Sequence, residues 1–251
     1  MNRTTTNQGN LWDAPEKDYR QRYKLPIHFT WDVASRERID YDGYWEQALQ
    51  LLPGAPADVI EVGCGDGFSS LLMQERGYRI SGVDYNDRAI EFARIFVPEG
   101  EFVVHDIRLL HELEVHHGHF DAATCIEVIE HIPSEFHDVV IQGIHKLLRP
   151  QGCLVLSVPS HQMPVHIWHY QHFSLEEITS LLEKNGFKVV QSVYQHRVNP
   201  FTSYLGWRLI SNRFYDIRIA RILVSFLFRK YFNIAGSAES AKRYLVKAEK
   251  L

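Results

Sequence analysis

Three residues near the middle of the chain, Glu127, Glu130 and His131, have types and a spacing that suit chemistry. If this segment is helical, residues at i, i+3 and i+4 lie on one side of a turn, so two carboxylates and an imidazole would face the same space. Such a set can bind a divalent metal ion. Alternatively, His131 alone can accept a proton from a reacting group or orient it. The spacing leaves both uses open, and we favour the second.

A second chemically capable segment runs from His161 to His172 and contains four histidines, a tryptophan and a tyrosine. It follows a predicted strand, and ligands of open parallel sheets bind beyond the carboxyl ends of the strands. Aromatic and imidazole side chains can stack on and hydrogen-bond to a polar ring such as a sugar. His169 or His172 could also add a ligand to a metal site at Glu127, Glu130 and His131.

A glycine-rich stretch at 63–67 is the third feature that could bind a ligand. An apolar run at 58–62 precedes it and predicts a buried parallel strand, whereas a helical pattern follows it. Glycines between a strand and a helix let a ligand approach backbone N–H groups, because no Cβ atom intervenes. The dinucleotide pattern G-x-G-x-x-G does not fit, because its sixth position is Phe68. The pattern is instead E-x-G-x-G-x-G, formed by Glu61, Gly63, Gly65 and Gly67.

Strand and helix patterns alternate along the chain, which predicts an α/β fold with a mostly parallel sheet. Strands are expected at 58–62, 79–84, 101–106, 120–126, 153–158, 187–193 and 243–248, the last of them antiparallel. Helices are expected at 40–52, 69–76, 87–97, 134–148 and 174–185. The last helix begins with a capping box, in which Ser174 and Glu177 satisfy each other's backbone N–H groups.

Two acids stand at the ends of predicted strands. Asp84 lies about 20 residues beyond the glycines, where nucleotide-binding βαβ units place an acid on the ribose hydroxyls. Asp106 ends the next strand and could accept a hydrogen bond from an adenine amino group. Both acids would meet the glycine turn at one edge of the sheet.

Together these features resemble the class I S-adenosylmethionine-dependent methyltransferases over roughly residues 55–195 and the last ten residues. The pattern is nearest to the ubiquinone-biosynthesis-type O-methyltransferases, to which the segment from His172 to Phe187 is also similar. The resemblance implies a Rossmann-like, doubly wound, seven-stranded sheet of order 3-2-1-4-5-7-6 with the last strand antiparallel. Five features occur in the same order along the chain as in this family: 61–67, Asp84, Asp106, 127–133 and the turn at 148–152.

The resemblance also implies S-adenosylmethionine as the cofactor. The three glycines would flank its methionine moiety, Asp84 would hold the ribose, Asp106 and Ile107 the adenine, and Glu127 would lie near the amino-acid end. The predicted cofactor-binding residues are Glu61, Gly63, Cys64, Gly65, Gly67, Asp84, Tyr85, Asp106, Ile107 and Glu127.

The resulting prediction is methyl transfer to a hydroxyl of a small-molecule or glycan-like acceptor, with His131 as the base or orienting group. The predicted acceptor-binding residues are His28, Trp168, His169, Tyr170 and His172. One alternative is a small-molecule N-methyltransferase. A similar Glu-x-x-Glu-His occurs in RNA 3′-end 2′-O-methyltransferases, where it binds a divalent metal; a metal-dependent enzyme of that kind is the second alternative. An inactive cofactor-binding scaffold is the third.

Composition narrows the classes of protein. The 251 residues are 45% hydrophobic, enough for one substantial core. A net charge of −4 provides no overall field for nucleic acid, so we do not favour a nucleic-acid partner. Three cysteines, a polar N-terminal segment and the lack of a long apolar run predict a cytoplasmic protein.

Two regions are expected: an N-terminal arm and helix at 1–54, forming part of an acceptor lid, and a methyltransferase domain at 55–251. The aromatic and basic segment Tyr19–Trp31 could cover the cofactor cleft or pack on the core. A helical insertion is expected at 197–240, and its residues 203–232 are basic and amphipathic. That segment could form a lid, a contact with an anionic membrane surface or a homodimer interface.

Overall fold

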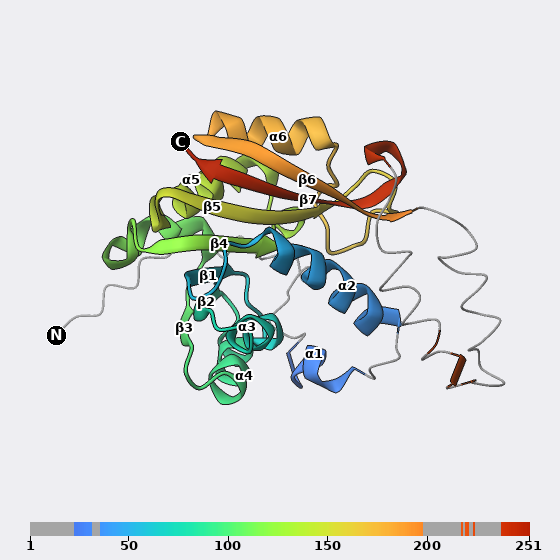
Figure 1. Cartoon of the computed structure of the whole chain (residues 1–251), viewed down its shortest axis with the longest axis horizontal. Coiled ribbons are helices and arrows are strands. Elements are labelled where there is room, and N and C mark those ends of the chain that lie inside the picture. Colours follow the sequence, from blue (N-terminus) through green and yellow to red (C-terminus); the bar gives the residue numbers. More distant parts are fainter. Residues whose placement is uncertain (1–22, 32–35, 198–216, 218, 221–222, 224–236) are drawn as a thin grey trace.

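One seven-stranded sheet forms the centre of the computed structural model (Figure 1). The structure describes residues 23–31, 36–197, 217, 219–220, 223 and 237–251. The strand order is β3-β2-β1-β4-β5-β7-β6, and β7 runs antiparallel to both β5 and β6. The predicted order and the antiparallel last strand are confirmed.

The elements alternate as expected. The strands are β1 (Asp58–Val62), β2 (Arg79–Asp84), β3 (Glu101–Val104), β4 (Phe120–Ile126), β5 (Leu148–Pro159), β6 (Phe187–Arg197) and β7 (Ala241–Lys250). The α-helices that begin and end within the described residues are α1 (Ile27–Thr30), α2 (Arg36–Leu51), α3 (Phe68–Gln74), α4 (Asp87–Phe96), α5 (His137–Leu147) and α6 (Leu175–Lys184). Short 3-10 helices add η3 (Ile107–Glu112), η4 (Glu114–His116), η5 (Ile129–His131), η6 (Ser134–Phe136) and η9 (Ala238–Ser240).

Several boundaries differ from the prediction for identifiable reasons. β3 ends at Val104 because Asp106 leaves the ladder and caps η3, accepting a hydrogen bond from the backbone N–H of Arg108 at 2.9 Å. β5 begins at Leu148, which pairs with Phe120 ahead of a register shift. β6 and β7 exceed their predicted lengths because they pair with each other well beyond the apolar residues that marked them.

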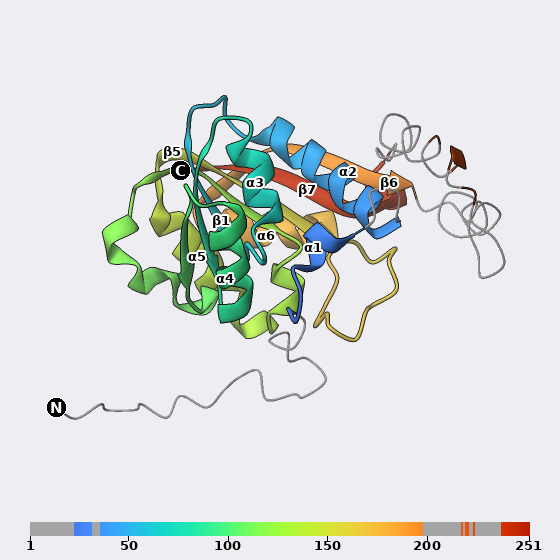
Figure 2. The same cartoon turned by 90° about the horizontal axis from the view of Figure 1, so that it is seen from below.

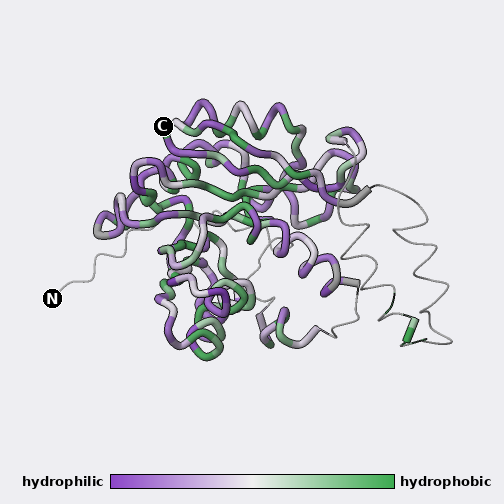
Figure 3. The backbone as a smooth tube through the Cα atoms, in the orientation of Figure 1, coloured by the Kyte–Doolittle hydropathy of each residue, from purple (hydrophilic) through white to green (hydrophobic). Residues whose placement is uncertain are grey.

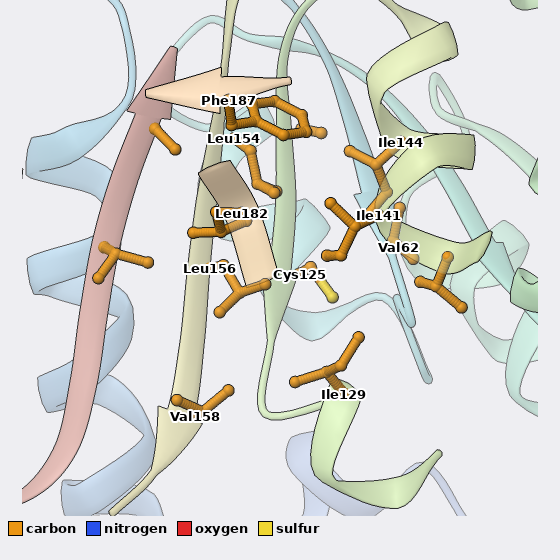
Figure 4. Packing of buried hydrophobic residues seen from close by; sticks show 14 of the residues in the cluster. Val62, Cys125, Ile129, Ile141, Ile144, Leu154, Leu156, Val158, Leu182 and Phe187 are labelled. Carbon is orange, nitrogen blue, oxygen red and sulfur yellow. The ribbon is translucent and has the colours of Figure 1, made fainter. Parts of the chain in front are cut away.

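Helices cover both faces of the sheet (Figure 1). Side chains of α5 and α6 pack on one face in the larger hydrophobic cluster, and those of α2, α3 and α4 pack on the other. Figure 4 shows Cys125 of β4 between Ile141 of α5 and Leu156 of β5 in the larger cluster. Figure 3 shows the hydrophobic stretches running along the central strands. This burial holds the carboxyl ends of β1, β2 and β4 in fixed positions.

The N-terminal region joins this architecture through α2, which contacts β5 and β7. The division of the chain at residue 54 stays a prediction. Nearly all of the predicted insertion at 197–240, including its proposed lid, membrane and dimer roles, lies outside the described residues. None of the helices that the structure describes combines the length and hydrophobicity needed to cross a bilayer.

Candidate active site

A cavity of about 940 Å³ lies at the carboxyl ends of β1, β2 and β4. The strand ends and the glycine turn form one side, and α1, α2, β7 and the loop after β5 provide the rest. Figure 2 shows α1 and the loop after β5 at the same end of the sheet. The sequence-predicted residues that line the cavity are His28, Glu61, Gly63, Cys64, Gly65, Asp84, Tyr85, Ile107, Glu127, Glu130, His131, Trp168 and His169.

The glycine turn after β1 has the backbone that its sequence predicts. Gly63 and Gly65 have φ angles of 79° and 52°, a left-handed conformation that glycine adopts without strain. A Cβ on Gly65 would lie 2.5 Å from the hydroxyl oxygen of Tyr23, so the N-terminal arm lies directly against the turn. Gly67 instead faces α4, where a Cβ would lie 2.8 Å from the Cα of Ala93. Its contact with a cofactor stays a prediction.

Asp84 ties the turn to the end of β2. Its carboxylate accepts hydrogen bonds from the backbone N–H groups of Gly65, at 3.0 Å, and Asn86, at 2.9 Å. Burial raises the pKa of Asp84 to about 6, although these hydrogen bonds act in the opposite direction. Each carboxylate oxygen can accept more than one hydrogen bond, so Asp84 can still receive donors from a ligand in the cavity.

Glu61, at the end of β1, is the second buried acid on this side of the cavity. The hydroxyl groups of Ser69 and Ser70 both donate to its carboxylate. Burial nevertheless raises the pKa of Glu61 to about 8. A cation bound nearby would favour the ionised form, so the environment of Glu61 suits a positively charged ligand.

The N-terminal arm closes over the glycine turn through His28. Its backbone N–H donates to one carboxylate oxygen of Asp66 at 2.9 Å, and its Nδ1 lies 2.7 Å from the other. Asp66 is fully buried beneath this contact. Tyr23, His28 and Trp31 of the arm line the cavity, and the role of the arm as a cover of the cleft stays a prediction. The predicted contact of His28 with the acceptor also stays a prediction.

Glu127 does not share a helical turn with Glu130 and His131, so that expectation is wrong. Its φ of 55° places it in the left-handed region, ahead of η5. The hydroxyl of Ser157 donates to one oxygen of its carboxylate at 2.9 Å. Nε of Arg243 donates to the other at 2.7 Å. These contacts from β5 and β7 hold the Glu127 carboxylate at the edge of the cavity.

Arg243 is a cavity residue that the sequence analysis missed. Burial acts to lower its pKa, but the nearby charges of Glu127 and Asp40 outweigh burial and raise it, so the guanidinium stays charged. Its Nη1 lies 3.9 Å from a carboxylate oxygen of Asp40 on α2. The sequence analysis predicted β7 only as the last strand. Arg243 lies 116 residues after Glu127, and no local motif marks the two as parts of one site.

Glu130 is fully buried and lines the cavity. Within the described part of the chain, neither of its carboxylate oxygens has a hydrogen-bond partner. Burial, followed by the nearby charge of Glu127, raises the pKa of Glu130 well above its usual value. A buried carboxyl group with no partner is costly, so a ligand that supplies a donor or a cation would be stabilised there.

The orientation of His131 follows from its ring contacts. Nδ1 lies 2.8 Å from the backbone carbonyl oxygen of Trp168. A carbonyl only accepts, so Nδ1 carries the proton, and Nε2 is the acceptor nitrogen of the neutral ring. Nε2 lies 3.9 Å from a carboxylate oxygen of Glu130. The ring of His169 meets that of His131 edge-on, with centroids 4.7 Å apart.

Three of the five residues considered for a metal site come together. Glu130, His131 and His169 can each place one ligand atom within 4.8 Å of the others. Glu127 is engaged by Arg243, and His172 by His169. A three-residue set of one carboxylate and two imidazoles could bind a divalent ion, whereas the full predicted ligand set is not assembled.

Three further predicted residues, Asp106, Tyr170 and His172, are not among the residues that line the cavity. Asp106 pairs with Arg108, while the next residue, Ile107, lines the cavity. The backbone N–H of Tyr170 donates to the carbonyl of Glu130 at 2.7 Å. Their predicted ligand contacts stay predictions. Aromatic residues from the arm and α2 line the cavity without having been predicted as site residues: Tyr23, Trp31, Tyr41, Tyr44 and Trp45.

Comparison with known proteins assigns the chain to a family. A family model described as a methyltransferase domain matches residues 36–192. A ubiquinone biosynthesis O-methyltransferase of Xanthomonas campestris pv. campestris is 33% identical over 150 residues, which cover 58% of this chain and 54% of the relative. The relative of the same description from Azoarcus sp. is 24% identical over 204 residues, which cover 76% of this chain and 82% of the relative. The chain thus spans about half the length of the Xanthomonas relative.

Solved structures show the same fold. A SAM-dependent methyltransferase from Archaeoglobus fulgidus has a TM-score of 0.60 at 19% identity, over 86% of this chain and 95% of that one. A second structure is the 1,6-didemethyltoxoflavin-N1-methyltransferase of Burkholderia thailandensis with bound S-adenosylhomocysteine. Its TM-score is 0.57 at 22% identity, over 92% of this chain and 86% of that one. The chain therefore belongs to the methyltransferase domain family, in agreement with the resemblance of its glycine motif.

Proposed function

We propose that the chain transfers the methyl group of S-adenosylmethionine to a hydroxyl of a small-molecule or glycan-like acceptor, with His131 as the base. The orientation of His131 carries this proposal, because its Nδ1–H is held by the carbonyl of Trp168 and its Nε2 is the acceptor nitrogen. An alcohol has a pKa far above seven and needs a base as its oxygen attacks. The names of the relatives, which are O-methyltransferases, agree with a hydroxyl acceptor.

The cofactor side of the cavity fits the group. S-adenosylmethionine would supply a methyl group bound to a positively charged sulfur. A nucleophile that attacks this methyl group displaces the sulfur. Gly63 and Gly65 let it approach the backbone, and Asp84 can accept hydrogen bonds from the ribose hydroxyls. The buried carboxyl of Glu61 favours a cationic ligand.

His131 is the one protein group that the transfer requires. Its Nε2 would take the proton of the acceptor hydroxyl as the acceptor oxygen bonds to the methyl carbon and the sulfur leaves as a neutral thioether. Aromatic side chains of the arm and α2 line the same space and present apolar surface to it. A dry site favours transfer, because a hydrated nucleophile must first lose its water.

Asp84→Ala should weaken S-adenosylmethionine binding at least about tenfold, since buried ribose hydroxyls would lose their acceptor. The wild-type affinity should also fall as the pH drops below about 6, because the protonated carboxyl of Asp84 is a poorer acceptor. Calorimetric titration measures both effects. Asp87→Ala, an exposed acid at the start of α4, is the matched control. Unchanged affinity in the Asp84 variant would place the cofactor elsewhere.

Turnover should survive treatment with a chelator, because a positioned imidazole base needs no metal to accept the proton. The measurement is the initial rate before and after treatment, and again after adding Mg²⁺ or Mn²⁺. Complete loss of turnover that metal restores would show that Glu130, His131 and His169 act as ligands. That result would favour the metal-dependent alternative.

The direct test of the proposal is a panel of acceptors with S-adenosylmethionine and the full-length chain. Small polyols, phenols, glycans, primary amines and an RNA 3′ end are compared by release of S-adenosylhomocysteine and by the mass and NMR spectrum of the product. We expect an O-methyl product from a small hydroxyl acceptor. An N-methyl product or a methylated RNA would select one of the other enzymes, and cofactor binding without turnover on any acceptor would support the inactive scaffold.

A further inference from the structure

The histidine pair His169 and His172, on the loop after β5, has a role that neither the family assignment nor the proposed function requires. We infer that His172 is a positioning residue that sets the tautomer of His169, so that His169 receives a hydrogen bond from a second donor group of the acceptor. The inference rests on the proposed function, since it places the acceptor in the same cavity.

His172 is anchored by two backbone carbonyls. Only 3% of the residue is exposed, and its Nδ1 lies 3.1 Å from the carbonyl oxygens of both Ser160 and Met163. Because carbonyl oxygens only accept, Nδ1 of His172 carries a proton. The surrounding loop is closed by the backbone N–H of Phe173, which donates to the carbonyl of Pro159 at 3.0 Å. The ring of His172 is therefore fixed in one orientation.

The protonation of His172 determines that of His169. Nε2 of His172 lies 2.8 Å from Nδ1 of His169. In a neutral His172 ring the proton is on Nδ1, so Nε2 accepts and Nδ1–H of His169 must donate. The reverse arrangement would require a second proton, and hence a positive charge, on a ring that is almost wholly buried. Nε2 of His169 is consequently the acceptor nitrogen of that ring.

Only His169 of this pair lines the cavity. His172 itself does not line the cavity, so the role inferred for it is indirect and acts through His169. Nε2 of His131 and Nε2 of His169 are both acceptors, and their rings meet at 4.7 Å. The unpartnered oxygens of Glu130 lie in the same part of the cavity, within the residues described. The two Nε2 atoms accept hydrogen bonds, so this wall selects an acceptor that carries a donor beside the group that is methylated.

Two substitutions separate anchoring of the loop from control of the tautomer. In His172→Asn, the side-chain amide can reach the position of Nδ1 and donate to the carbonyls, but no atom replaces Nε2. In His172→Gln, the amide oxygen can reach the position of Nε2 and accept from His169. His161→Gln is the matched control, because His161 is on the same loop and its side chain is largely exposed.

The first measurement is nitrogen NMR of the full-length chain with labelled histidine, with the His169 signals identified from His169→Gln. We expect a protonated Nδ1 and an unprotonated Nε2 at His169 in the wild type, a mixture of tautomers in His172→Asn and the wild-type state in His172→Gln. A proton on Nε2 of His169 in the wild type would overturn the inference. This measurement needs no turnover, so it stands even if the proposed function fails.

The second measurement is the steady-state kinetics with the acceptor found in the panel. His172→Asn should raise the KM for the acceptor about three- to tenfold, the effect of one hydrogen bond, with much less change in kcat. His172→Gln should restore KM, and His161→Gln should leave it unchanged. An unchanged KM in His172→Asn would contradict the role in binding, and an equal loss in both His172 variants would show that His172 only anchors the loop.

Discussion

Replacing His131 by glutamine should lower kcat for methyl transfer by about 10²- to 10⁴-fold, the usual contribution of a positioned general base. The amide keeps a polar side chain but cannot accept the proton that leaves the acceptor hydroxyl. The affinity for S-adenosylmethionine should stay nearly unchanged, because the contacts expected for the cofactor come from β1, β2 and the glycine turn. Single-turnover rates and calorimetric titration together separate these two effects.

His117→Gln is the control for this change, because His117 is exposed on the connection between η4 and β4. Its kinetics should match those of the wild type. Full activity in the His131 variant would show that the acceptor oxygen needs no base from this position. An amine acceptor, which reacts in its neutral form, would explain that outcome and favour N-methyl transfer.

Replacing Arg243 by methionine should lower the free energy of unfolding by up to about 3–5 kcal/mol, the cost of removing one partner from a fully buried ion pair, because the two side chains here are only 12% and 16% exposed. The change leaves the partly buried Glu127 carboxylate without its cation, next to the buried acid Glu130. For a chain of this size, the melting temperature should fall by roughly 6–20 °C. Chemical and thermal denaturation measure the two quantities.

The double variant Glu127→Gln with Arg243→Met supplies the control. It removes the unpaired charge while keeping a side chain that can hydrogen-bond to Ser157, so it should recover a large part of the lost stability. If the double variant is as unstable as Arg243→Met alone, the loss comes from packing around Tyr44, over whose ring the guanidinium lies at 5.1 Å. That result would contradict a stabilising role for the ion pair.

Local patterns in the sequence were sufficient for the framework of the site. The apolar run of β1, the glycines after it and Asp84 at the end of β2 each follow from backbone requirements within a few residues. The capping box of α6 was predicted for the same reason. The strand order came from the resemblance to a family rather than from any single element.

The tertiary structure alone decided how the chemical groups are arranged. Arg243 reaches Glu127 across 116 positions, and His28 reaches Asp66 across 38, and no local pattern encodes pairings of that separation. The left-handed backbone at Glu127 removed it from the helical turn that its spacing with Glu130 and His131 had suggested. The acceptor nitrogens of His131 and His169 were likewise determined by partners that the folded loop brings within hydrogen-bond distance, the carbonyl of Trp168 and the ring of His172. The sequence thus specified which groups could react, whereas folding determined their orientation, because hydrogen-bond direction depends on long-range contacts.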